Sequence, residues 1–196
     1  MDPALIVTIV VVVVVVLLLL AIFYAVRRSR ARRQEQQRER SREEFGSEYE
    51  RTAREKGSEE EAERELRRRR GSVERNVEPL SDERREHFEG QWGEVERVFV
   101  DNPERSIEMA DRTVSDILHE RRFITDSSQS DEETEKNLGA MHPDVADDYR
   151  EARRMRADVV ARSGGSLGEG AGEQSTEDLR QTIQRYRAVY ERIVER

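Results

Sequence analysis

Hydrophobic residues are distributed in two different ways along this 196-residue chain. Residues 4–26 form a continuous apolar stretch, in which Thr8 is the only polar side chain apart from the Tyr24 hydroxyl. Beyond it, apolar residues recur every three or four positions within polar segments, which is the spacing of amphipathic helices. No segment alternates with the period of two that is typical of a half-buried strand. The pattern therefore predicts an all-α protein.

The apolar stretch has the length of a membrane-spanning helix, because about 20 such residues cross a hydrocarbon core of roughly 30 Å. In lipid, unsatisfied backbone groups are so costly that even a valine-rich stretch becomes helical. A cleaved signal peptide is the alternative. It needs a preceding positive charge, a shorter apolar core and a small-residue cleavage site, and Met1-Asp2-Pro3 carries no basic side chain. We predict one N-terminal transmembrane helix, within an anchor segment spanning residues 1–26.

Basic residues follow this stretch immediately. They are Arg27, Arg28, Arg30, Arg32 and Arg33. The positive-inside rule places such a cluster, and the chain after it, in the cytoplasm, with the N-terminus outside. The same arginines are candidates for contact with anionic lipid head groups, at about 1 kcal/mol each. The alternative is that they act as a topology signal and nothing more.

Residues 27–80 are predicted to form a basic juxtamembrane segment and a charged helical stalk. Glutamate and arginine are often four positions apart there, which stabilises an exposed helix. Sustained heptads are missing, so we expect no long coiled coil. Gly57-Ser58 indicates a helix end followed by a new N-cap, and Gly71-Ser72 together with Glu78-Pro79 indicates a hinge into the distal domain.

Residues 81–196 carry the amphipathic pattern of an antiparallel helical bundle. Ser81 is the expected N-cap of its first helix, and Pro103 suits the opening turn of the second. A short helical turn is expected near residues 131–138, and a third long helix from His142-Pro143. The glycine-rich residues 163–174 are predicted to be a loop.

The last helix is expected to follow a capping box that starts at Ser175, with Asp178 in place of the usual Glu or Gln. The core of the bundle is predicted from the apolar stripes. Its anchors are Phe88, Trp92, Phe99, Ile107, Tyr149, Leu179 and Tyr186.

Charge is unevenly divided along the chain. Residues 27–70 hold 16 basic and 12 acidic residues, whereas residues 71–196 hold 19 basic and 30 acidic residues, a net charge of −11. An acidic domain is repelled by nucleic acid and by anionic lipid. We therefore expect no nucleic-acid partner, although 33 of the 35 basic residues are arginine.

Catalytic and metal-binding motifs are missing. The chain has no cysteine and three histidines, and His119-Glu120 lacks the second histidine of a zinc-protease motif. There is no phosphate-binding glycine loop ending in Lys-Ser/Thr and no Gly-x-Ser-x-Gly elbow. We expect a protein that is not an enzyme and that needs no cofactor or metal; a cryptic hydrolase is the least favoured alternative.

Several short motifs resemble those of a widespread family of uncharacterised bacterial proteins with one membrane span. They include Phe45-Gly46-Ser47-Glu48-Tyr49, Phe88-x-x-x-Trp92, Arg97-Val98-Phe99-Val100-Asp101-Asn102-Pro103, Tyr149-Arg150 and Ser175-Thr176-Glu177-Asp178-Leu179. The resemblance covers roughly residues 42–196 and implies a helical architecture and a bacterial origin, without an activity. With the predicted anchor, this gives a location in the bacterial plasma membrane. The resemblance also implies that Phe45 and Tyr49 pack on something. Val73, Val77 and Leu80 are the candidates, and such packing would dock part of the stalk on the bundle.

These observations favour a membrane-tethered adaptor or scaffold that binds a cytoplasmic protein through a basic surface on that partner. The alternative is a structural or envelope-stress protein that acts by self-assembly through its stalk or membrane helix. The sequence leaves the oligomeric state open.

Overall fold

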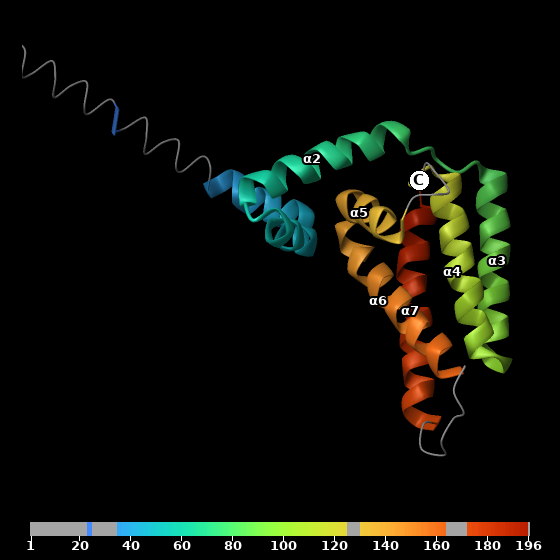
Figure 1. Cartoon of the computed structure of the whole chain (residues 1–196). Helices are drawn as coiled ribbons and strands as arrows, with labels where there is room; N and C mark the ends of the chain where they lie inside the picture. Colours follow the sequence, from blue (N-terminus) through green and yellow to red (C-terminus); the bar gives the residue numbers. More distant parts are fainter. Residues whose placement is uncertain (1–22, 25–34, 125–129, 164–171, 196) are drawn as a thin grey trace, which may run out of the picture. The chain divides into compact units, whose positions relative to one another are not determined.

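The computed structural model describes residues 23–24, 35–124, 130–163 and 172–195 (Figure 1). Contacts between residues group the chain into two compact units, residues 1–43 and 44–196, and each is described by itself. In the first unit, residues 35–43 are helical. Within the described residues every regular element of the second unit is also an α-helix. The prediction of an all-α protein is confirmed to that extent.

Most of the predicted anchor, and all five arginines that follow it, lie outside the described residues. Among the described residues there is no helix with the length and apolar character that crossing a membrane requires. The membrane anchor therefore stays a prediction.

The second unit begins with a helical hairpin formed by residues 44–56 and α2 (Glu59–Asn76). Gly57 has φ +71, a left-handed conformation that favours glycine, and ends the first helix. Ser58 is the N-cap of α2, and its hydroxyl accepts a hydrogen bond from the backbone N–H of Glu61 at 3.4 Å. The turn predicted at Gly57-Ser58 is confirmed.

The hinge predicted at Gly71-Ser72 is wrong, because α2 continues through both residues. Arginines precede Gly71, and Val73 after it is buried in the bundle core. Burial of that side chain outweighs the cost of about 1 kcal/mol for a glycine inside a helix. The helix ends only at Asn76, before the non-helical residues that contain Glu78-Pro79.

Helices α3 (Asp82–Asp101) and α4 (Pro103–Glu120) begin where predicted. The Ser81 hydroxyl accepts a hydrogen bond from the backbone N–H of Arg84 at 3.2 Å. Pro103 is at the first position of α4, and the Asn102 side chain caps that helix by accepting from the backbone N–H of Arg105 at 3.1 Å. Proline fits there because an N–H at this position has no partner within the helix.

Three more helices complete the chain: α5 (Asp131–Met141), α6 (Pro143–Ser163) and α7 (Gly172–Val194). The short helix predicted near residues 131–138 is confirmed and ends three residues later. The capping box predicted at Ser175 is wrong. Residues 172–174 already belong to α7, and an N-cap residue must precede the helical backbone. Part of the predicted loop 163–174 is therefore helical.

Helices α3, α4, α6 and α7 pack side by side, with α5 against α6 and against α2 (Figure 1). Their shared core includes Phe88, Val95, Ile117, Leu138 and Val189, all nearly inaccessible to solvent. Trp92 stacks on Tyr190 with ring centroids 4.4 Å apart, which joins α3 to α7.

Candidate interaction surfaces

The predicted core anchors occupy the interior of the bundle with one exception. Phe88, Trp92, Ile107, Tyr149, Leu179 and Tyr186 are buried. Phe99 is only partly buried and packs against the edge of the core. It is therefore the anchor that remains accessible to a partner.

A hollow of about 330 Å³ lies beside Phe99, between α3 and α7. Trp92, Phe99 and Ile183 provide its apolar lining, and its other lining residues are polar or charged. Arg187, one of these, forms an ion pair with Glu96 at 3.2 Å across the two helices. Such an apolar hollow with a charged rim can receive one hydrophobic side chain of a protein partner.

The acidic character of the distal domain is concentrated on α3 and α4. Residues 82–120 hold 12 acidic and 5 basic residues, a net charge of −7. The exposed carboxylates that make no ion pair with the described residues are Glu83, Glu86, Glu89, Asp101, Glu108 and Asp116. Helix α3 lies at the edge of the bundle and packs mainly on α4 (Figure 1). We call this surface the α3–α4 face.

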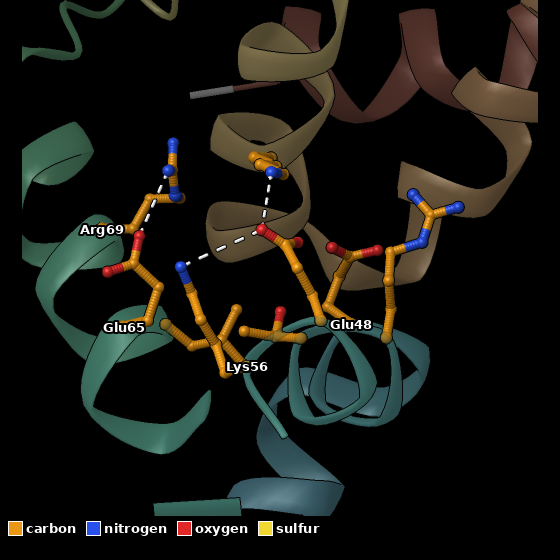
Figure 2. Close-up of a pocket in the computed structure, with 9 residues that line it drawn as sticks. Glu48, Lys56, Glu65 and Arg69 are labelled. Atoms are coloured by element: carbon orange, nitrogen blue, oxygen red, sulfur yellow. Dashed lines mark hydrogen bonds and ion pairs between the residues drawn. The ribbon is translucent and has the colours of Figure 1, made fainter. Parts of the chain in front are cut away.

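A second charged region joins the N-terminal hairpin to α5 and α6. A small pocket of about 50 Å³ lies within it, with Glu65 and Arg69 of α2 on one side and Glu48 and Lys56 of the preceding helix on another (Figure 2). The Glu48 carboxylate forms an ion pair with Arg150 of α6, and both side chains are almost completely buried. Lys136 of α5 also lines the pocket.

Phe45 and Tyr49 form a separate apolar cluster with Leu66 of α2. Their predicted packing against Val73, Val77 or Leu80 is wrong, because Val73 and Leu80 belong to the bundle core and Val77 packs against it. The hairpin turn at Gly57 places Leu66, rather than these more distal residues, opposite the two aromatic rings.

Polar groups inside the bundle are connected to one another. The Tyr186 hydroxyl donates a hydrogen bond to Asp111 at 2.9 Å, and Arg156 lies 3.4 Å from the same carboxylate. Arg153 donates to the Tyr149 hydroxyl at 3.3 Å. Burial raises the pKa of Tyr149 to about 12, and burial followed by the charge of Asp111 raises the pKa of Tyr186 above its ordinary range. These tyrosines stay protonated at neutral pH, and the network joins α4, α6 and α7.

The three histidines lie on different helix faces or ends. His87 is exposed on α3 and 3.1 Å from the Gln91 amide, His119 is exposed near the end of α4, and His142 caps the end of α5. Within the described ranges, no three His, Asp or Glu side chains are placed to hold a metal ion.

Comparison with protein families, with curated proteins and with solved structures finds no match to this chain. The class that the structure itself defines is a helical bundle with a docked N-terminal hairpin. Its two candidate surfaces are the α3–α4 face with the adjoining hollow and the charged contact beneath the hairpin.

Proposed function

We propose that this chain is a membrane-tethered, non-enzymatic adaptor. In this proposal residues 4–26 form a single transmembrane helix in the bacterial plasma membrane, with the N-terminus outside. The arginines from Arg27 to Arg33 lie at the cytoplasmic head groups, and the bundle binds a cytoplasmic protein. The location follows the charge asymmetry around the apolar stretch and the resemblance to single-span bacterial proteins.

The α3–α4 face is the observation that carries the proposal. Its exposed carboxylates, which form no ion pair with the described residues, attract a partner with a basic surface and orient it on approach. The hollow beside it, lined by Trp92, Phe99 and Ile183, offers an apolar contact of the kind that dominates interface energies. Together they suit a partner that has a basic patch for the carboxylates and, separate from it, one protruding hydrophobic side chain for the hollow, whose rim includes Arg180 and Arg187.

The proposal is tested by neutralising this face in the full-length chain. In the variant Glu83→Gln, Glu86→Gln, Glu89→Gln, we expect binding of the captured partner to weaken by on the order of 10-fold, because exposed charge pairs each contribute up to about 1 kcal/mol. The partner is captured by photocrosslinking from Asp116 in solubilised membranes, and its affinity is measured at low and high salt. The affinity of the unaltered chain should fall as salt rises.

A matched control changes the net charge equally on α6. Asp144→Asn, Asp148→Asn, Glu151→Gln removes one exposed and two half-buried carboxylates that pair with arginines and should leave binding unchanged. Equal weakening by both triple variants would show that net charge rather than the α3–α4 face matters. Recovery of no protein crosslinked at Asp116 above the amount recovered without illumination would contradict the adaptor function.

A further inference from the structure

The residues from 44 to 70 hold themselves together separately from the bundle. Phe45, Tyr49 and Leu66 form their own apolar cluster, and Arg70 forms an ion pair with Glu44 at 2.6 Å. The bundle core begins to include α2 only at Val73. We call residues 44–70 the arm.

Ionic contacts join the arm to α5 and α6. Glu55 pairs with Lys136 at 3.1 Å, and the Arg69 guanidinium donates to Asn137 at 2.8 Å. The side chains of the Glu55 pair are 43% and 26% exposed, so water and salt weaken their attraction. Glu48 and Arg150 differ, because their side chains are only 3% and 10% exposed.

Gly139 of α5 makes room for this buried pair. A Cβ at Gly139 would lie 2.6 Å from the Glu48 carboxyl carbon, closer than carbon atoms can approach without a shift. The clashing group is the end of a flexible side chain, so an alanine would displace the Glu48 carboxylate rather than distort α5. The substitution stabilises helix α5 itself, because alanine has a higher helix propensity than glycine.

Gly71 gives the arm a point about which to turn. It lies inside α2, between the arm and the last turn that Val73 anchors in the core. Glycine weakens a helix at that position because it loses more backbone entropy than other residues. Gly71, which does not break α2, is thus a position of low helix propensity within the continuous helix.

We propose that the arm can detach from α5 and α6 by turning about Gly71. In the docked state it is held by the ion pair of Glu48 with Arg150, in which the Glu48 side chain lies against Gly139. We call this contact the lock. Release separates Arg150 from Glu48 and Lys136 from Glu55, while the pairs of these two cations with Asp147 and Glu132 remain. The lock does not depend on the membrane anchor or on the α3–α4 face.

The test places spin labels on the full-length chain in detergent at Arg64→Cys on the arm and Asp116→Cys on α4. The chain has no other cysteine. When the docking residues are unaltered, the two labels should give a single distance population. Gly139→Ala and Glu48→Gln should each add a longer-distance population, with the docking equilibrium falling on the order of 100-fold, as expected when a buried charge loses its partner.

Gly93→Ala is the matched control, since that helical glycine has nothing within 4 Å of an added Cβ, and it should leave the distance unchanged. Trp92, the chain's one tryptophan, reports on the bundle core. Its emission should stay constant in all variants. An unchanged distance in both Gly139→Ala and Glu48→Gln would overturn the lock. A longer distance accompanied by exposure of Trp92 would overturn the idea of an independent arm.

Discussion

At the scale of single residues, burial changes the pKa of His142. Both ring nitrogens are buried and lack a hydrogen-bond partner among the described residues, and the ring centroid is 5.7 Å from that of Phe123. Burial lowers the pKa of His142 to about 4, helped by the charges of Arg192 and Arg121 and opposed by Asp144. The folded bundle therefore holds this imidazole neutral.

This pKa makes stability depend on pH. An unfolded histidine has a pKa near 6.5, so between about pH 6.5 and pH 4 the unfolded chain binds a proton that the folded chain excludes. The contribution of His142 is complete above pH 6.5 and is lost as pH falls toward 4. We expect His142→Leu to flatten the decline of the urea midpoint over this range. An identical decline in the variant and the unaltered chain would show that His142 is not the group responsible.

Single residues with long-range partners were the hardest to predict. Glu48 and Arg150 are 102 positions apart in the sequence, and no local pattern relates them. Gly139 offered a partial signal, because a glycine inside a helix costs about 1 kcal/mol relative to alanine. Nothing in the sequence showed that this glycine makes room for a glutamate on another helix.

At the scale of helices, the start signals predicted at Ser58 and Ser81 were correct, whereas the capping box predicted at Ser175 was wrong. Ser58 and Ser81 each accept a hydrogen bond from a backbone N–H three residues ahead, and this chemistry needs no tertiary contact. The prediction at Gly71 failed because α2 is stabilised by burial of Val73, which depends on the bundle. Helix propensity is a property of single residues and takes no account of such a tertiary contact.

Arg121 fixes the ends of three segments to one another. Its guanidinium donates to the backbone carbonyls of Ile193 at 2.7 Å, Glu195 at 3.3 Å and Glu78 at 3.3 Å. It thereby joins the end of α4 to the end of α7 and to the linker after α2. A cation suits the end of α7, where unpaired carbonyls carry partial negative charge.

Replacing Arg121 with methionine should lower the free energy of unfolding by about 2 to 3 kcal/mol, because buried carbonyls lose a charged donor. Arg122→Met is the neighbouring control. Arg122 is exposed and pairs with Glu78 only at the surface, so its loss should cost less than about 1 kcal/mol. Both values come from urea unfolding followed by circular dichroism. Equal losses in the two variants would contradict the bridging role of Arg121.

In the whole molecule, basic and acidic residues are concentrated in different parts of the chain. The segment after the apolar stretch is basic, whereas residues 71–196 carry a net charge of −11, of which residues 82–120 hold −7. An anionic membrane would attract the first and repel the second. This arrangement suits a bundle that is presented away from the membrane to a basic protein, which is the basis of the adaptor proposal.

Membrane attachment with a cytoplasmic bundle is the central claim, and cysteine accessibility tests it most directly. Glu83→Cys and Asp116→Cys place single exposed reporters on the bundle. Cells producing each full-length variant are treated with a membrane-impermeant maleimide, intact and after permeabilisation, and the membranes are then isolated. We predict labelling only after permeabilisation, with the chain in the membrane fraction. Labelling of intact cells, or recovery of the chain in the soluble fraction, would contradict the account.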